Sequence, residues 1–323
     1  MILLLGASGY FGKTFANELR RRGRSFIPLT REAFDYTRFD FLFDYLRTMR
    51  PAFVINAASY CTDPSEGPED LDREKAMSVN ALLPQMISRV CLMTKTPWGH
   101  VSSGSIYSGL KVLEHGRWRQ EKDSTKPGLA DLPAASIAGF NETDEPNFSF
   151  RFPPCDFYSG TKALAEEAIR EIGECYIWRL REPFNERDEA CNFLARLKSS
   201  GVRGLNSFSH LEDSVRACVD LWEYHAPFGI YNVVNPGPLH VDAIAQRLHG
   251  IVQSNRFAWI GRDQAARPAL RGLRSNCVLD ASKLLKAGIR MRPATEALDD
   301  ALDRLETTHC GVRATEAVHH ASA

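Results

Sequence analysis

Short apolar runs alternate with helical repeats over the first hundred residues. Ile2–Leu5 is a continuous apolar run that ends in a glycine, as a buried parallel strand does. Phe11, Phe15 and Leu19 then recur every four residues, which places them on one face of a helix over Phe11–Arg22. The same pattern predicts the next elements: strands at Ser25–Thr30, Phe53–Ala58 and Pro97–Ser102, and helices at Phe39–Arg50 and Leu71–Thr94.

The second half of the chain begins with a break in this rhythm. Residues 110–147 are rich in Gly, Pro, Ser, Lys and Asp and show little periodicity, so we expect a long loop excursion at the carboxyl edge of the sheet. Regular elements return afterwards: helices at Asp156–Ile172, Leu211–His225, Val241–Val252, Asp280–Ala287 and Thr295–Thr307, and strands at Cys175–Arg181 and Gly229–Val234.

This order of elements predicts an α/β fold. Alternating strands and helices with short connections form a Rossmann-type doubly wound parallel sheet, which we assign to residues 1–181 and 229–237 as a dinucleotide-binding domain. Residues 182–228 and 238–308 are predicted to form a smaller α/β substrate-binding lobe, and residues 309–323 a disordered tail.

Composition excludes several classes of protein. Of the 323 residues, 44% are apolar, and 40 Lys and Arg balance 40 Asp and Glu, so no excess charge points to nucleic acid. No apolar run reaches the ~18 residues of a membrane span, and no secretion signal precedes the first strand. We therefore expect a cytoplasmic enzyme whose eight scattered cysteines are reduced and mostly buried and which holds no metal.

Glycines follow the first strand directly. Gly6-Ala-Ser-Gly9-Tyr-Phe-Gly12 lies between a strand and a helix, where glycines allow a tight turn and a close approach of the backbone to a pyrophosphate. The spacing is G-x-x-G-x-x-G, whereas the commoner dinucleotide motif is G-x-G-x-x-G. The residues expected to contact a cofactor here are Gly6, Ser8, Gly9, Tyr10, Phe11 and Gly12.

The end of the second strand bears on the choice of cofactor. Arg31 could accept the 2′-phosphate of NADP, whereas Glu32 could serve the ribose of NAD if it points inward. We favour NADP(H) over NAD(H), and we include Arg31 and Asp35 among the cofactor-binding residues.

A tyrosine and a lysine one helical turn apart carry the candidate chemistry. Tyr158 and Lys162 share a helix face, so the phenol and the ammonium can converge on one site. The ammonium, with the oxidised nicotinamide ring, is expected to lower the tyrosine pKa and make the phenol a usable acid or base. Ser103, at the end of the fourth strand, can donate to a developing oxyanion, and Asn80 is an unusual polar residue inside a helix.

These motifs together resemble the extended short-chain dehydrogenases/reductases of the NAD-dependent epimerase/dehydratase family. Within that family the chain is similar to dTDP-4-dehydrorhamnose reductase and to the plant and viral UDP-4-keto-6-deoxyglucose 3,5-epimerase/4-reductase. The segments that carry the likeness are Val54–Tyr60, Gly139–Phe148, Phe157–Glu167, Gly229–Gly237 and Arg274–Leu284.

The resemblance implies reduction of the C4 ketone of a nucleoside-diphosphate 4-keto-6-deoxy sugar. Tyr158 would be the proton donor and Lys162 its activator, Ser103 would polarise the carbonyl, and Asn80 would be structural. Ala57, Ala58 and Ser59 would lie along the cofactor. The residues implied to bind substrate are Ser105, Asn192, Arg196, Arg274 and Asn276, with Arg181 as a further candidate for the diphosphate. A homodimer is left open.

One departure from the family bears on activity. The epimerising members carry a cysteine where this chain has Ser105, whose hydroxyl is a much weaker base than a thiolate. The basic partner expected after Asn192 is Arg196, which stays protonated. We therefore predict the 4-keto reductase half-reaction without the epimerase half.

Two alternatives remain at this stage. A sugar-nucleotide 4-epimerase or dehydratase with tightly bound NAD uses the same Tyr–Lys pair, although a dehydratase would need carboxylates where Gly104 and Ser105 stand. A non-catalytic regulator that senses NADP is the other, although such proteins often lose the Tyr or the Lys.

Overall fold

The computed structural model describes residues 1–323 except 62–70, 130, 188, 198–203, 255–274 and 321–323. Six parallel strands form the central sheet, in the order β11-β8-β4-β3-β1-β2. The prediction of a doubly wound parallel sheet is thereby confirmed. The strands are β1 (Ile2–Leu5), β2 (Phe26–Leu29), β3 (Phe53–Asn56), β4 (Trp98–Ser103), β8 (Cys175–Leu180) and β11 (Gly229–Asn232).

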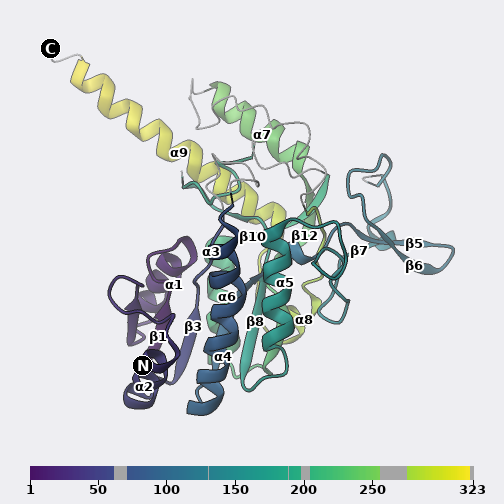
Figure 1. Cartoon of the computed structure of the whole chain (residues 1–323). Helices are drawn as coiled ribbons and strands as arrows, with labels where there is room; N and C mark the ends of the chain where they lie inside the picture. Colours follow the sequence, from purple (N-terminus) through teal and green to yellow (C-terminus); the bar gives the residue numbers. More distant parts are fainter. Residues whose placement is uncertain (62–70, 130, 188, 198–203, 255–274, 321–323) are drawn as a thin grey trace.

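Helices cover both faces of this sheet because its strands bury both. In β1, Ile2 and Leu4 join the apolar cluster on one face, and Leu3 and Leu5 join the cluster on the other. The first face packs against α1 (Tyr10–Arg21) and α6 (Leu211–Glu223), and the second against α2 (Phe39–Met49), α4 (Leu83–Thr94) and α5 (Phe157–Ile169). A continuous apolar run in the sequence was thus a reliable sign of a strand covered twice (Figure 1).

The chain reverses its direction across the sheet at β1. It first moves outward from β1 to β2, and then returns to place β3 on the other side of β1. In open α/β sheets, ligands bind at such a switch point, outside the carboxyl ends of the strands. The loops that follow β1 and β3, and the end of neighbouring β4, therefore frame the position where a site is expected.

The insertion at residues 110–147 is more regular than the sequence indicated. β5 (Leu110–Glu114) and β6 (Arg117–Glu121) form an antiparallel hairpin, and β7 (Ile137–Ala138) pairs with the other edge of β5. The short helix η4 (Ala134–Ser136) precedes β7. The expectation of an irregular loop was wrong because β6 is exposed over most of its length, so no alternation of apolar and polar residues marks it. Figure 1 shows the hairpin projecting from the body of the molecule.

A second, smaller sheet lies in the lobe. It contains β9 (Pro183–Phe184), β10 (Leu205–His210) and β12 (Asn235–His240). α7 (Val241–Ser254) and α9 (Ala294–His320) pack on its apolar core, and α8 (Ser282–Lys286) lies beside β11. β10 and β12 were not predicted from the sequence, since the buried polar residues of β10 and the two prolines of β12 hide a strand pattern.

Two further boundaries differ from the expectation. α9 continues to His320, past Thr307 where we ended the helix and through most of the segment expected as a disordered tail. The long helical segment after β3 is divided into α3 (Arg73–Met77), the π-helical turn η2 (Ser78–Leu82) and α4.

Residues 229–237, which we assigned to the dinucleotide-binding domain, are shared between the two sheets. The six-stranded sheet takes β11 from this range, whereas β12 starts within it and belongs to the second sheet.

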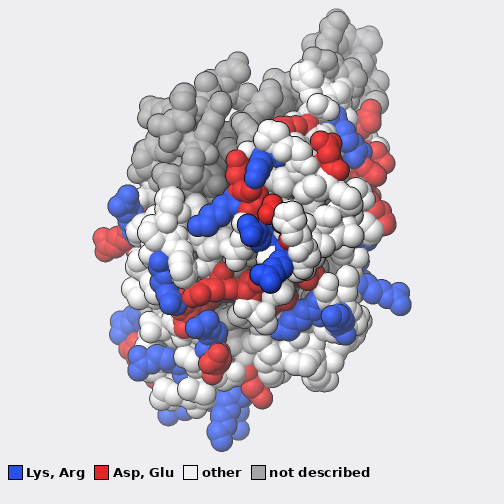
Figure 2. Space-filling view, turned by 90° about the vertical axis from the view of Figure 1, so that its right-hand side faces the viewer, with Lys and Arg blue, Asp and Glu red and all other residues white. Residues whose placement is uncertain are grey.

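The surface shows mixed charge. Figure 2 shows Lys and Arg interspersed with Asp and Glu over one face of the molecule, as the balanced composition suggests. In the part of the chain that the structure describes, no helix combines the length and the apolar character needed to cross a bilayer.

Candidate active site

The glycine loop, residues 6–12, is shaped by the absence of side chains. Gly6 has φ +74°, and a Cβ there would lie 2.6 Å from the backbone nitrogen of Ala58. A Cβ on Gly12 would collide with the carbonyl oxygen of Gly6. Gly9 is the N-cap of α1 and offers no side-chain cap, and the first turn carries no acid. The first amides of α1 are therefore free to bind an anion such as a pyrophosphate.

The turn after β3 lies against this loop and is fixed by two asparagines. Asn56 is fully buried, and its Oδ1 accepts a hydrogen bond from the backbone N–H of Ala58 at 3.1 Å. Asn80 accepts from the backbone N–H of Tyr60 at 2.8 Å and donates to its carbonyl oxygen at 2.7 Å. Asn80 stands in η2, so the helical distortion around this polar residue turns its amide toward the end of β3.

Tyr158 lies where the ends of β3 and β4 meet the start of α5. The residue before α5, Asp156, caps the helix by accepting from the backbone N–H of Ser159 at 2.7 Å. The side chains of Ser103 and Ser59 lie close enough to the Tyr158 hydroxyl to lower its pKa. The structure thus brings together the predicted Ser103 and Tyr158, and it adds Ser59, which we had expected only along the cofactor.

Lys162 is buried behind this pair. Its side chain is 1% exposed, and its Nζ donates to the carbonyl oxygen of Val101 at 3.2 Å and lies 5.8 Å from the centre of the Tyr158 ring. Burial lowers the pKa of Lys162 to about 8, against weaker opposing effects of Cys61 and Glu166. Burial and the nearby Lys162 also hold the pKa of His100 well below its ordinary value. The ammonium is consequently easier to deprotonate than an exposed lysine.

Burial sets the direction of the Tyr158 pKa in the chain alone. Burial of the hydroxyl raises this pKa above its ordinary value, and the neighbouring Ser103 and Ser59 side chains lower it by less. The lowering expected from Lys162 together with the oxidised nicotinamide concerns the cofactor complex and stays a prediction. A phenol with a raised pKa is protonated at neutral pH, which suits a proton donor.

The remaining cofactor candidates lie around the glycine loop. Burial raises the pKa of Tyr36 overall, and nearby Arg31, which is exposed beyond the end of β2, lowers it by less. Asp35 is exposed and accepts from the backbone N–H of Thr37 at 3.2 Å. The Tyr10 hydroxyl lies 3.5 Å from Asn185 Oδ1 in the lobe, so the loop meets the lobe here. Ser8 is exposed, and Phe11 packs on the core.

The structure describes four of the five residues predicted to bind substrate. Arg274 lies outside the described residues. Asn192 donates to the carbonyl oxygens of Asn185 and Arg187 and accepts from the N–H groups of Asn185 and Leu194. All four hydrogen-bonding positions of this amide are therefore used within the chain, and Asn192 holds its own segment together.

Three other residues predicted to bind substrate, Arg181, Arg196 and Asn276, contact other residues of the chain. Arg196 Nη2 lies 2.5 Å from Glu182 Oε2, and Arg181 Nη1 lies 3.2 Å from Glu182 Oε1. Burial opposes the charge of Arg196, but the ion pair with Glu182 raises its pKa, so it stays protonated as predicted. Asn276 lies at the base of the insertion, where its carbonyl oxygen accepts from the N–H of Gly109 at 2.6 Å.

Among the residues that the structure describes, the buried Oγ of Ser105 has no hydrogen-bond partner. A buried hydroxyl that is 7% exposed and unpaired next to Ser103 is available to a ligand group.

A buried network behind the site was not predicted from the sequence. Glu166 and Arg179 are both at most 3% exposed and pair at 2.7 Å. Glu166 Oε1 also accepts from Ser102 Oγ at 2.5 Å, and Arg179 donates to the Tyr107 hydroxyl at 2.9 Å. The only signal in the sequence was the position of Glu166, one turn after Lys162 on the same helix face.

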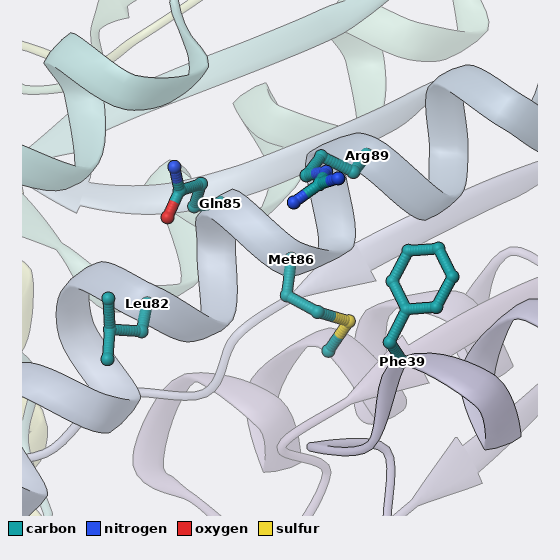
Figure 3. A pocket seen from close by; sticks show the side chains of 5 residues that line it. All are labelled: Phe39, Leu82, Gln85, Met86 and Arg89. Atoms are coloured by element: carbon teal, nitrogen blue, oxygen red, sulfur yellow. The ribbon is translucent and has the colours of Figure 1, made fainter.

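Two other features lie apart from this cluster. Glu186, His210 and Glu212 bring ligand atoms within 4.8 Å of one another, but His210 Nδ1 caps α6 and Arg187 pairs with Glu212 at 2.7 Å. A hollow of about 270 Å³ between α2 and α4 is lined by Phe39, Leu82, Gln85, Met86 and Arg89 (Figure 3). No predicted site residue lines that hollow.

Comparisons with known proteins show which proteins this chain is similar to. A trifunctional UDP-glucose 4,6-dehydratase/UDP-4-keto-6-deoxy-D-glucose 3,5-epimerase/UDP-4-keto-L-rhamnose-reductase of Arabidopsis thaliana is 26% identical over 259 residues, which are 78% of this chain and 35% of that protein. The chain therefore spans about a third of the length of this relative.

Two solved structures share the fold over most of the chain. The UDP-rhamnose synthase of Acanthamoeba polyphaga mimivirus has a TM-score of 0.74 at 17% identity and covers 94% of this chain and 98% of its own. A dTDP-4-dehydrorhamnose reductase from Bacillus anthracis in complex with NADP has a TM-score of 0.65 at 17% identity, with the same coverage of 94% and 98%.

The family is shown by a match along the sequence itself. The model of the RmlD substrate binding domain matches residues 1–203, which include the glycine loop, Ser103, Tyr158 and Lys162. Because this match covers more than half of the 323 residues, the chain belongs to the RmlD substrate binding domain family.

Proposed function

We propose that this protein reduces the C4 ketone of a nucleoside-diphosphate 4-keto-6-deoxy sugar, with NAD(P)H as the reductant. The observation that carries the proposal is the convergence of Tyr158, Ser103 and Lys162 at the carboxyl edge of the sheet, beside the glycine loop. The names of the relative in Arabidopsis and of both solved structures refer to rhamnose-type sugar nucleotides, which supports this class of substrate.

The residues present fit a dinucleotide. The glycines at positions 6 and 12 allow the loop to pack closely on the turn after β3 and on its own backbone, and the uncapped start of α1 offers amides to a pyrophosphate. Ala57, Ala58 and Ser59 would line the cofactor, and Tyr158 and Lys162 would contact its nicotinamide ribose. A reduced nicotinamide supplies a hydride to the carbonyl carbon.

The side chains of the site supply the proton and stabilise the charge. The Tyr158 hydroxyl donates its proton to the ketone oxygen, while Ser103 donates a hydrogen bond to the same oxygen as charge develops on it. The phenolate that remains is stabilised by the hydroxyls of Ser103 and Ser59 and by the ammonium of Lys162. In this mechanism Tyr158 is the acid that donates the proton, and Lys162 acts as a cation.

We also propose that 3,5-epimerisation is absent. Abstraction of a proton beside the ketone needs a base, and Ser105 offers only a neutral hydroxyl. Arg196 stays charged through its ion pair with Glu182 and cannot accept a proton. The unpaired Ser105 hydroxyl would instead donate to, or accept from, a sugar hydroxyl.

The direct test is reduction of purified substrates. UDP- and dTDP-4-keto-rhamnose, already epimerised, should each be offered with NADPH and with NADH, and nucleotide oxidation followed at 340 nm. We expect turnover with at least one of them and a lower Michaelis constant for NADPH, because exposed Arg31 can bind a 2′-phosphate. No nucleotide oxidation with any pair of sugar and cofactor would contradict the proposed function and favour a regulator. Equal Michaelis constants for NADPH and NADH would contradict a role for Arg31 in binding the 2′-phosphate.

The pH dependence of reduction should follow Lys162. Since its pKa is about 8 in the free chain, kcat/KM should be level below that pH and fall as the pH rises through it and the ammonium becomes neutral. The raised pKa of Tyr158 keeps the donor protonated across this range. In Lys162→Arg, whose guanidinium does not titrate there, the decline should move to higher pH; an unchanged decline would assign it to another group.

A further inference from the structure

The carboxyl end of β4 is joined to α5 by two buried hydrogen bonds. Lys162 Nζ donates to the carbonyl oxygen of Val101 at 3.2 Å. The next residue of β4, Ser102, donates from its Oγ to Glu166 Oε1 at 2.5 Å. Lys162 and Glu166 are one turn apart on α5, so the two contacts follow each other along the interface. Lys162, Ser102 and Glu166 are each at most 3% exposed, which keeps water from competing for these bonds.

Glu166 is itself held from β8. Arg179 Nε and Nη2 donate to Glu166 Oε2 at 2.9 and 2.7 Å. Arg179 is the residue of β8 that stands opposite Ser102 in the sheet, so both side chains reach the carboxylate from neighbouring strands. Arg179 Nη1 also donates to the Tyr107 hydroxyl at 2.9 Å, and this hydroxyl donates to the carbonyl oxygen of Asp144 at 2.7 Å. The Glu166 carboxylate is therefore fixed by its partners, and it can in turn fix Ser102.

Ser102 stands between two residues to which the reduction assigns a part. Val101 supplies the carbonyl that holds the Lys162 ammonium, and Ser103 carries the hydroxyl that would donate to the ketone oxygen. Ser102 is anchored through its backbone in the sheet and through its side chain on α5, which limits the rotation of the peptide units on both sides of it. A displacement of about 1 Å in an active site can cost about 10²-fold in rate. The anchor of Ser102 can therefore act on the chemistry without touching the substrate.

We propose that Glu166 is a positioning residue for the reduction. Its carboxylate holds the Ser102 side chain and thereby fixes both neighbours of Ser102 on β4, the Val101 carbonyl that holds Lys162 and the Ser103 hydroxyl. Glu166 touches neither the substrate nor the cofactor in this role. The proposal rests on the proposed function, because an effect on the rate requires that Lys162 and Ser103 take part in the reduction.

Ser102→Ala tests the proposal without removing a charge, because it deletes only the hydroxyl that Glu166 holds. We expect kcat for the 4-keto sugar to fall about tenfold while KM for NADPH changes less than threefold, since the glycine loop is untouched. Hydrogen exchange of residues 98–107, followed by mass spectrometry without ligands, should become faster. Ser214→Ala is the matched control, because this hydroxyl is equally buried and donates to the carbonyl oxygen of His210 at 2.8 Å on α6. It should change neither kcat nor the exchange of residues 98–107.

Glu166→Gln adds a readout that a loss of stability alone does not move. The titratable groups around the Lys162 ammonium are those of Tyr158, His100, Cys61 and Glu166. The charge of Glu166 raises the pKa of Lys162 against the larger effect of burial, so its removal should lower that pKa. The decline of kcat/KM should therefore begin at lower pH in Glu166→Gln than in the wild type. Glu167→Gln, which changes a half-exposed carboxylate on the same helix, should leave the decline in place.

Each outcome separates this proposal from the function on which it rests. Unchanged kcat in Ser102→Ala, or an equal fall in Ser214→Ala, overturns the positioning role and leaves Glu166 a structural residue. A fall in kcat without faster exchange of residues 98–107 overturns the anchoring of β4, and an unchanged pH decline in Glu166→Gln overturns the effect of its charge on Lys162. If the wild type reduces no 4-keto sugar, the proposed function fails and the positioning role fails with it, while faster exchange in Ser102→Ala would still show that Glu166 holds β4.

Discussion

Replacing Tyr158 by Phe should reduce kcat for the 4-keto sugar by about 10²- to 10⁴-fold, the range that a positioned general acid contributes. That loss corresponds to about 3–5 kcal/mol of transition-state stabilisation. The ring would keep its place at the start of α5, and only the hydroxyl that meets Ser103 and Ser59 would be lost. Cofactor binding, measured by fluorescence of NADPH, should therefore change far less than turnover.

Tyr224→Phe is the matched control for this experiment. Tyr224 is 63% exposed at the end of α6, away from the site, so the same chemical change should leave kcat within twofold. If Tyr158→Phe keeps more than a tenth of the wild-type turnover while Tyr224→Phe is unaffected, Tyr158 is not the proton donor. The reduction would then have to take its proton from water or from another hydroxyl.

The parts of the fold that the sequence predicted are those set by local pattern. β1, the glycine loop and α1 follow from a continuous apolar run, three glycines and a four-residue repeat, and no distant residue is needed to recognise them. β10 and β12 could not be predicted as strands from the sequence, because their polar and proline residues are accommodated by contacts that exist only in the folded lobe. One example is Asn206, which is fully buried and accepts from the N–H of Cys277 at 2.9 Å.

The same distinction holds for the candidate site. The meeting of Ser103 and Tyr158 was predictable, since the carboxyl end of a parallel strand and the next helix start share one edge of the sheet. The position of Ser59 beside Tyr158 depends on how the loops pack, about which sequence spacing carries no information. The raised pKa of Tyr158 in the chain alone has a related origin, because it comes mainly from burial, and burial is a tertiary property.

Glu166→Gln should destabilise the protein by about 3–5 kcal/mol, because it leaves the charge of Arg179 buried without a counterion. Both side chains are nearly inaccessible, and their 2.7 Å contact is backed by hydrogen bonds to Ser102 and Tyr107. The free energy of unfolding, measured in urea without ligands, should show this loss directly. Burial opposes the charge of Arg179, but Glu166 raises its pKa. Arg179 therefore stays protonated, and the free-energy cost of burying its charge without a partner remains.

Glu167→Gln, the same exchange one residue further along α5, separates the buried pair from an effect of charge on the helix. Glu167 lies 3.7 Å from Arg151 in an ion pair whose side chains are 35% and 58% exposed, so its loss should cost no more than about 1 kcal/mol. Equal losses for the two variants would mean that Glu166 is solvated and that the network behind Lys162 does not form. A large loss for Glu166→Gln alone, restored in Glu166→Gln/Arg179→Met, would assign the cost to the unpaired guanidinium, because the double variant removes the buried charge together with its partner.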